Sequence, residues 1–351
     1  MNKKRILFYT SAAGLLAVIL FVLIYVGKEY YRVLIKSNVR IGASSKEYLY
    51  IPTNATFDNV LDSLRKGNFL ISEESFINAA KRGRYTSGVK PGRYRLKQDM
   101  SNKALIRALS LGEQEAVNLV IAGHIRNYKK LAAVLSRNME ADSLQYLVAL
   151  QNDTLVSSLG FTMPTFMSMF IPNTYQVYWN SSPEATLRRL KREYEKFWDE
   201  SRRRKAETMQ YSQVEVAIIA SIVDEETNKN DEMSRIAGVY INRLKQGIPL
   251  QADPTLKYAL ENFSIKRVLN AHMTIESPYN TYKYLGLPPG PICMPSIAAI
   301  DAVLNYEKHD YLYFCAKDDF SGYHAFAKTL TQHNHNAFKY RQALNRNRVF
   351  R

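Results

Sequence analysis

Cysteine is scarce in this chain of 351 residues, which contains only Cys293 and Cys315. Two cysteines exclude a disulfide-rich scaffold, and nothing in their sequence context supports metal ligation by thiolates. One disulfide is possible in an oxidising compartment, but the sequence alone does not settle the geometry that it needs. Cys315 lies in the apolar run 311–316 and is equally consistent with a small side chain in a buried strand.

Long uncharged apolar runs are absent apart from residues 6–26 near the N-terminus. At about 1.5 Å per residue, this run matches the roughly 30 Å core of a bilayer. It follows the basic segment 3–5, which favours a cytoplasmic tail at 1–5 and an extracytoplasmic location for residues 28–351. A cleaved signal peptide is the alternative, but the run is too long and no small-residue cleavage site follows it. We therefore predict a single-pass anchor.

Acidic residues are fewer than basic ones, 32 against 48, so the formal net charge is +16. Such a charge can indicate nucleic-acid binding, which an extracytoplasmic location argues against. Anionic lipid headgroups or an anionic cell-wall polymer fit better. Much of the charge falls in a predicted amphipathic helix from about Glu184 to Tyr211, whose basic residues form either a solvated face or a membrane-surface contact.

The pattern of elements predicts an α+β chain without internal repeats. We expect a short linker at 28–46, a small α+β module at 47–113 and a larger mixed α+β domain at 114–351. The small module is either a structural spacer or a ligand-binding unit. The stretch 248–296, rich in Pro, Gly, Asn and Tyr, is predicted to be irregular and functional rather than disordered. Within it, Asp253 is expected in a polar turn stiffened by Pro254.

Three consecutive acids end an apolar helix that is predicted at about 214–226. Ser212 and Glu215 have the spacing of a capping box, which begins the helix. Glu226 shares a face with apolar residues three, four and seven positions earlier, whereas Asp224 and Glu225 point elsewhere. A carboxyl group beside an apolar face at a helix C-terminus should have a raised pKa, as a general acid needs. The alternative is an ordinary solvated helix end.

Several kinds of site are compatible with the polar residues downstream. Glu226 and Asp253 could form the carboxylate pair of a glycosidase. His324, His333 and His335 with Glu226 could instead bind a metal, but their spacing matches no standard ligand signature. A serine hydrolase is weaker still, because the chain has no Gly-x-Ser-x-Gly elbow. From the residues alone these alternatives stay open.

Taken together, the motifs resemble the MltG-like (YceG) family of endolytic murein transglycosylases. The matching motifs, in the order of the family, are PGRY at 91–94, PNTY at 172–175, ASIVDEET at 220–227, VYINRL at 239–244, LQADPT at 250–255, YNTY at 279–282, GLPPGPI at 286–292, YLYF at 311–314, His324 with Phe326, and His333 with Asn334. Each motif alone is weak, whereas the ordered set is specific and covers roughly residues 45–345.

The resemblance implies a LysM-like module followed by a lytic transglycosylase domain in a bacterial cytoplasmic membrane protein, with the catalytic part extracytoplasmic or periplasmic. Glu226 would be the general acid and base that cleaves the MurNAc–GlcNAc bond inside peptidoglycan strands and leaves 1,6-anhydroMurNAc ends, without metal or cofactor. We interpret six residues of the motifs as substrate-binding: Gln251, Asp253, Asn280, Tyr282, His324 and Phe326. Partners would be glycan strands, the membrane and cell-wall synthesis enzymes. A non-catalytic peptidoglycan-binding scaffold and a glycoside hydrolase are the competing interpretations.

This chain departs from the family pattern in three places. Asp224-Glu225 replaces the usual Glu-Lys, which adds a negative charge beside Glu226. That charge should raise the pKa of Glu226 further or pair with a cation such as Arg243. The usual Pro-Glu-Gly reads Ala-Gly-His at 122–124, and the usual Gly-Gly-His is Gly-Tyr-His at 322–324. These changes concern local binding more than the reaction.

Overall fold

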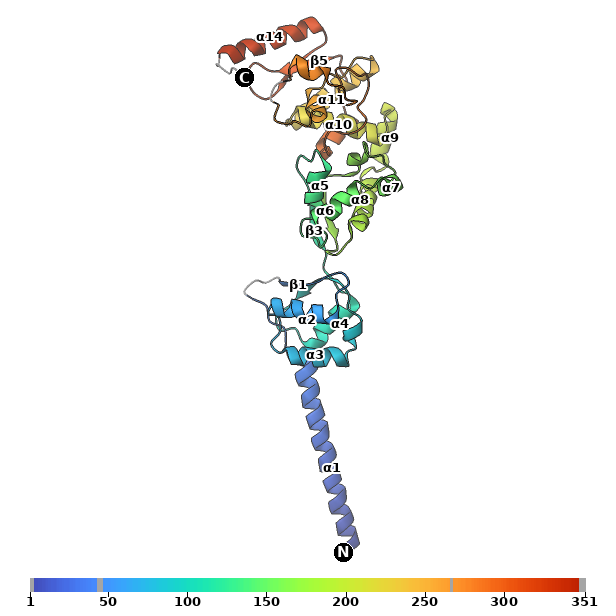
Figure 1. Ribbon diagram of the computed structural model, residues 1–351, viewed down its shortest axis with the longest axis vertical. Helices are drawn as coiled ribbons and strands as arrows, with labels where there is room; N and C mark the ends of the chain where they lie inside the picture. The colour runs from blue at the N-terminus through green and yellow to red at the C-terminus, as the bar shows by residue number, and fades with distance from the viewer. Residues whose placement is uncertain (1–2, 43–46, 266–267, 347–351) are drawn as a thin grey trace. The chain divides into compact units, whose positions relative to one another are not determined.

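The computed structural model describes residues 3–42, 47–265 and 268–346 of the chain (Figure 1). It confirms the α+β class and divides into two compact units. The first unit comprises the residues up to 117 together with 138–140 and 176–181, and the second comprises the remainder. Each unit is described separately below.

The N-terminal helix α1, Lys3–Tyr30, runs without interruption into the π-helical turn η1, Tyr31–Ile35 (Figure 1). Residues 12–35 have a mean hydropathy of 2.0, and the most apolar window of this span is not buried against the protein, although Val33 near its end is. By length and composition it can cross a membrane, and no second such helix occurs in the described ranges. The predicted apolar helix is therefore present.

The small module pairs one two-stranded antiparallel sheet with three short helices. Its elements are β1 (Glu47–Ile51), α2 (Phe57–Lys66), α3 (Glu73–Arg82), the 3-10 turn η2 (Tyr85–Ser87), β2 (Gly92–Leu96) and α4 (Asn102–Leu111). Each helix begins at a hydroxyl side chain, Thr56, Ser72 or Ser101, that accepts a hydrogen bond from a backbone N–H of the first turn. Alternation along β1 buries Leu49 and Ile51 in the core that the helices close.

The segment predicted as a linker contributes to this core. Val33 and Val39 are buried among the module's apolar residues. The buried Asn38 side chain donates a hydrogen bond to Asn102 Oδ1 at 2.8 Å, and Ser37 forms an isolated β-bridge with Ser101. The end of α1 is therefore anchored directly to the module.

The second unit is mainly helical. Its elements, with the strand β3 that enters it, are β3 (Val117–Ile121), α5 (Tyr128–Leu135), α6 (Ser143–Leu150), α7 (Asp153–Ser158), η3 (Phe166–Met169), β4 (Asn173–Val177), α8 (Pro183–Phe197), α9 (Glu200–Met209), α10 (Gln213–Glu226), α11 (Asn230–Lys245), α12 (Asp253–Ala259), η4 (Asn270–Thr274), α13 (Ile297–Leu304), β5 (Tyr313–Ala316), β6 (His324–Ala327) and α14 (Leu330–Arg346). β3 pairs with β4, and β5 pairs antiparallel with β6.

The long basic helix predicted at 184–211 is wrong as a single element, because the chain turns at Trp198 and Asp199. Trp198 is buried, and the Asp199 carboxylate accepts a hydrogen bond from Arg202 N to begin α9. Its amphipathic character is confirmed in α8, where Leu187 and Leu190 are buried while basic residues pair with acids four positions away. Propensity did not reveal the break because both flanking segments favour helix.

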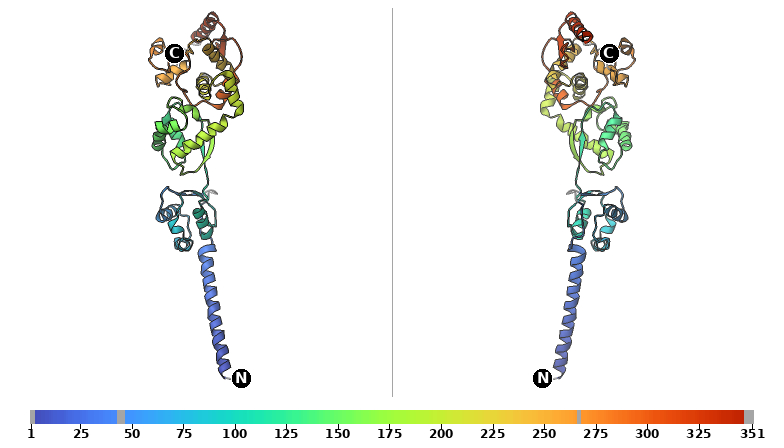
Figure 2. Two further views of the ribbon diagram at one scale, coloured as in Figure 1. Left: turned by 90° about the vertical axis from the view of Figure 1, so that its right-hand side faces the viewer. Right: turned by 90° about the vertical axis from the view of Figure 1, so that its left-hand side faces the viewer.

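Helix α10 forms the centre of the second unit. Every residue from Val216 to Val223 is buried, and α11, α12 and α13 pack around it. The hairpin β5–β6 carries α14 beside it, as the orange and red segments of Figures 1 and 2 show. This arrangement supports the C-terminal end of α10 from several sides.

Three local predictions are corrected by the structure. Asp253 does not lie in a turn but opens α12, with Pro254 in the first turn of that helix, where proline is tolerated. The stretch 248–296 contains this helix and η4, so it is only partly irregular. The segment predicted as a buried strand at 311–316 forms a strand only from Tyr313 and is half-buried, because its residues border a cavity.

Candidate active site

Glu226 lies at the C-terminal end of α10 in the wall of a cavity of about 350 Å³. The capping box predicted at Ser212 and Glu215 is confirmed and fixes where the helix begins. The side chains around the cavity are mainly polar and aromatic: Glu226, Tyr240, Arg243, Leu250, Gln251, Asp253, Tyr282, Tyr313, Phe314, Cys315, Ala316, His324 and His333. Such a lining suits a polar ligand with apolar faces.

Tyr240 on α11 is the direct partner of Glu226. Its hydroxyl donates a hydrogen bond to Glu226 Oε1 at 2.6 Å. The tyrosine is 2% exposed, and its ring meets Phe314 of β5 edge to face, so that its position is fixed by packing. A donor held in this way stabilises the ionised carboxylate and orients the carboxyl group.

The pKa of Glu226 is raised from its ordinary 4.5 to about 7. Burial is the main cause, and the negative charge of Asp253 adds to it. The hydrogen bond from Tyr240 and the charge of Lys257 act in the opposite direction and lower the pKa. A carboxyl group with a pKa near neutrality can both give and take a proton, as general acid–base catalysis requires.

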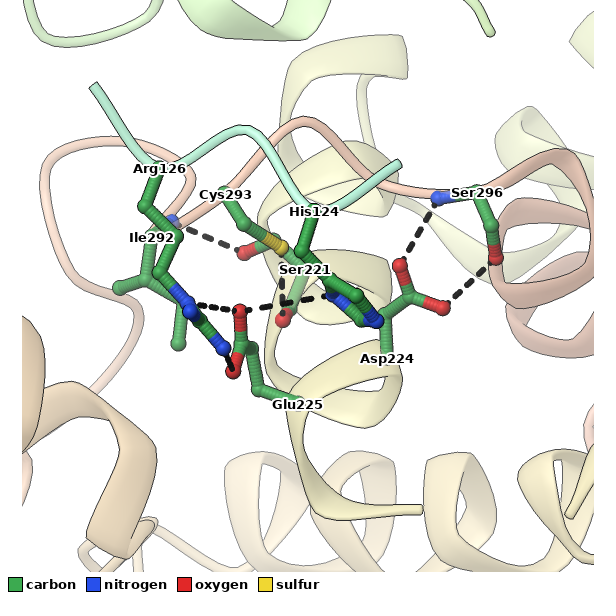
Figure 3. Close-up of polar contacts among 8 residues, drawn as sticks. All are labelled: His124, Arg126, Ser221, Asp224, Glu225, Ile292, Cys293 and Ser296. Carbon is green, nitrogen blue, oxygen red and sulfur yellow. Dashed lines mark hydrogen bonds and ion pairs between the residues drawn. The ribbon is translucent and has the colours of Figure 1, made fainter. Parts of the chain in front are cut away.

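Asp224 and Glu225 are held away from the cavity by partners distant in sequence (Figure 3). Asp224 accepts hydrogen bonds from Ser296 N at 3.0 Å and Ser296 Oγ at 2.7 Å, at the start of α13. Glu225 forms a bidentate ion pair with Arg126, at 2.6 and 2.7 Å, and His124 lies 4.0 Å from it. The expectation that the extra charge raises the pKa of Glu226 or pairs with a cation is confirmed, because Glu225 raises that pKa and pairs with an arginine. The arginine is Arg126, so the suggestion of Arg243 is wrong.

Arg243 instead organises the cavity wall. Its buried guanidinium donates hydrogen bonds to Pro249 O, to Leu312 O and, at 2.5 Å, to Gln251 Oε1. Gln251 has a left-handed backbone with φ of 51°, which is uncommon outside glycine and asparagine. Because its oxygen is occupied by Arg243, the amide nitrogen of Gln251 is available to a ligand as a donor.

Asp253 and Tyr282 form a second pair in the wall, in which the tyrosine hydroxyl donates to Asp253 Oδ1 at 2.5 Å. Asn280 is fully buried and does not line the cavity. Its side-chain nitrogen donates to Met273 O and Ile275 O, each at 2.9 Å, and therefore secures the loop that presents Tyr282. The structure thus brings Asp253 and Tyr282 to the cavity and gives Asn280 a supporting position.

His324 on β6 reaches the cavity, whereas Phe326, two residues later on the same strand, is not among its lining residues. His324 Nδ1 lies 2.7 Å from Glu232 Oε2, and His324 N donates to Glu232 Oε1 at 2.8 Å. Phe326 packs against Tyr311 and Phe314 and supports the hairpin. His333 of α14 stacks on Tyr313 at the cavity, and its Nδ1 is buried without a hydrogen-bond partner in the described residues.

Sequence reasoning did not assign three participants, Tyr240, Tyr313 and Glu232, to the site, and it offered His333 there only as a possible metal ligand. A usable signal existed for Tyr240, which lies three residues before Arg243 and therefore on the same helical face. Glu232 gave no signal, because an acid in the first turn of a helix is ordinary at the surface.

Metal and disulfide chemistry were open alternatives. Within the described ranges, no group of three or more His, Cys, Asp or Glu side chains is placed to hold a metal ion. Cys293 and Cys315 are free thiols rather than a disulfide. Cys293 is buried beside α10, where its sulfur lies 3.5 Å from Ser221 O (Figure 3).

Comparisons with known proteins identify the family of the chain. The model of the YceG-like family matches residues 49–339. An endolytic murein transglycosylase of Bacillus subtilis is 29% identical over 307 residues, which cover 83% of each chain. One from Streptococcus pneumoniae R6 is 27% identical over 347 residues, 87% of this chain and 61% of the relative. The crystal structure of a YceG-like protein from Listeria monocytogenes has the same fold, with a TM-score of 0.53 and 24% identity over 83% of this chain and 98% of that one.

Proposed function

This chain belongs to the YceG-like family, and we propose that it is an endolytic peptidoglycan lytic transglycosylase with Glu226 as its general acid and base. The observation that carries the proposal is a carboxyl group with a pKa of about 7 in the wall of a polar, aromatic-lined cavity. Relatives that share more than a quarter of the aligned residues are endolytic murein transglycosylases. The substrate would be a glycan strand of peptidoglycan.

In the first step Glu226 is protonated and donates its proton to the glycosidic oxygen between MurNAc and GlcNAc. The bond from C1 of MurNAc to that oxygen breaks, and GlcNAc leaves with a new hydroxyl group. Positive charge develops at C1 and the ring oxygen, as in other glycoside cleavages. Hydrogen bonding from Tyr240 stabilises the Glu226 carboxylate that this step produces.

In the second step the Glu226 carboxylate removes the proton from the 6-hydroxyl of the same MurNAc. The oxygen attacks C1, a C1–O6 bond closes the 1,6-anhydro ring, and Glu226 is protonated again. The nucleophile belongs to the substrate, so no second carboxylate has to activate water. This explains why Asp253 can be engaged by Tyr282 and still serve the reaction as a negative charge near C1.

The remaining polar groups of the wall would bind the sugars. The Gln251 amide nitrogen offers a donor. Tyr282 lies beside Asp253, to which it donates a hydrogen bond, and His324 lies against the ring of Phe314. Asn280 and Phe326 act indirectly, because they support the loop and the hairpin that carry these side chains. Each role is testable by comparing loss of binding with loss of turnover.

The N-terminal helix would anchor the enzyme in a bacterial cytoplasmic membrane, with residues 28–351 on the outer, wall-facing side. The apolar span supports the anchor, and the basic residues before it support the orientation. We assign the small module to a LysM-like role in holding glycan near the membrane. Cleavage there would limit the length of newly made strands and place the enzyme beside cell-wall synthesis enzymes.

Digestion of purified sacculi tests the activity. Full-length protein in detergent should release muropeptides with 1,6-anhydro ends, identified by mass spectrometry, and Glu226→Gln should release none above background. Reducing ends in place of anhydro ends would show a hydrolase. Binding to sacculi that is equal in both proteins, without release of fragments, would show a non-catalytic scaffold.

A further inference from the structure

His324, a residue of the cavity wall, is paired with the carboxylate of Glu232. Glu232, in the first turn of α11, is only 4% exposed at its side chain, and His324 on β6 is 14% exposed. Both oxygens of Glu232 are used by the same residue, one by His324 Nδ1 at 2.7 Å and one by His324 N at 2.8 Å. Burying a carboxylate costs free energy, so a pair with such complete hydrogen bonding indicates a defined role.

The contact assigns the proton on the imidazole ring. An ionised carboxylate only accepts hydrogen bonds, so Nδ1 must carry the hydrogen that points to Glu232. In neutral His324, Nε2 is then an acceptor. Nε2 has no hydrogen-bond partner among the described residues and is not one of their buried unpartnered atoms. Since His324 lines the cavity, this nitrogen is accessible to a ligand there.

Part of the acceptor capacity of the cavity wall is already used. The side-chain oxygen of Gln251 is occupied by Arg243, and Asp253 Oδ1 is occupied by Tyr282. His324 Nε2 therefore adds a neutral acceptor to the carboxylate oxygens that remain, Asp253 Oδ2 and Glu226 Oε2. Sugar hydroxyls and N-acetyl N–H groups must donate as well as accept when they are buried.

We propose that Glu232 is a positioning residue that fixes the Nδ1–H tautomer of His324, so that His324 Nε2 accepts a hydrogen bond from a hydroxyl or N-acetyl N–H group of the glycan beside the cleaved bond. This assignment rests on the proposed transglycosylase function. It adds a specificity determinant on β6 to the acid–base group on α10. Replacing the carboxylate by an amide would turn Nε2 from an acceptor into a donor.

A purely structural role for the pair is the competing explanation, because the pair also ties the β5–β6 hairpin to α11. The chain offers a matched control for that role. Tyr323, which precedes His324 just outside β6, donates a hydrogen bond to Asp231 Oδ2 at 3.1 Å, and Asp231 precedes Glu232 in the first turn of α11. This second tie is exposed and its residues do not line the cavity.

The experiment compares four variants of the full-length protein in detergent by initial rates of anhydro-muropeptide release from sacculi. Glu232→Gln and His324→Phe should lower kcat/KM roughly ten- to hundredfold, as expected when a paired polar group is lost or reversed. His324→Gln, which can offer an amide oxygen, should recover at least about fivefold over His324→Phe. Tyr323→Phe should stay within about twofold of the parent protein.

The protonation of the two ring nitrogens of His324 can be measured, and a purely structural role of the pair predicts no change in it. In protein labelled with ¹⁵N-histidine, His324 should show a protonated Nδ1 and a bare Nε2, and Glu232→Gln should reverse the two. Unchanged kcat/KM in Glu232→Gln, equal rates for His324→Gln and His324→Phe, or an equally large loss in Tyr323→Phe would overturn the proposal. If the parent protein forms no anhydro products, the transglycosylase function fails instead, and the tautomer measurement still tests the Glu232–His324 pair alone.

Discussion

The balance of groups around Glu226 predicts that two conservative substitutions shift its pKa in opposite directions. The Tyr240 hydroxyl lowers this pKa by donating to the carboxylate, and the Asp253 charge raises it. Tyr240→Phe removes the donor but keeps the ring that packs on Phe314. Asp253→Asn removes the charge but keeps an oxygen that can accept the hydrogen bond of Tyr282.

The size of each shift follows from the contacts. A hydrogen bond to a charged group contributes about 1.5–3 kcal/mol, and one pKa unit corresponds to about 1.4 kcal/mol. Tyr240→Phe should therefore raise the pKa of Glu226 by about one to two units from its value of about 7. Asp253 has the smaller influence of the two, so Asp253→Asn should lower the pKa by less than about one unit.

The pH dependence of kcat/KM for anhydro-muropeptide release measures these shifts. Because the first step needs protonated Glu226, activity should fall as the pH rises through the pKa of this group in the free enzyme. The alkaline limb, near pH 7 in the parent protein, should move to about pH 8–9 in Tyr240→Phe and to lower pH in Asp253→Asn. This account of the site would be refuted if the alkaline limb moved in the same direction in both variants, or if it moved to lower pH in Tyr240→Phe.

Three further predictions concern stability. The folded-state pKa of Glu226 is raised, so its contribution to stability is present below about pH 4.5 and is lost as the pH rises through about 7. At pH 8, Glu226→Gln should therefore be more stable than the parent protein by up to about 3 kcal/mol. Water in the cavity screens the charge and makes this difference smaller. Thermal unfolding at pH 4 and pH 8 checks the difference. Arg126→Met should lower the unfolding free energy by about 1–3 kcal/mol because Glu225 loses its bidentate partner. If the double variant Arg126→Met with Glu225→Gln is destabilised as much as Arg126→Met alone, that cause is contradicted. Asn280→Ala should lower the unfolding free energy by about 1–3 kcal/mol and raise KM, because the loop that presents Tyr282 becomes disordered. An unchanged unfolding curve in denaturant would show that other contacts hold this loop.

Features that depend on neighbours in sequence were predictable from the sequence. The apolar anchor, the capping box at Ser212 and Glu215, and the placement of Glu226 on the apolar face of its helix each follow from composition or helical period. The ordered motifs indicated the family. They also named Gln251, Asp253, Tyr282 and His324, which line one cavity in the structure, while their role in binding stays a prediction.

Tertiary structure alone decided which partner each polar side chain has. Arg126 rather than Arg243 neutralises Glu225 across 99 residues, and Glu232 meets His324 across 92. The turn between α8 and α9 likewise depends on the burial of Trp198. Helical period and capping act over three or four residues, so they fix the face on which a side chain lies. The identity of the group facing it depends on how the helices pack, and that packing makes a charged helix end into a carboxyl group able to exchange a proton near pH 7.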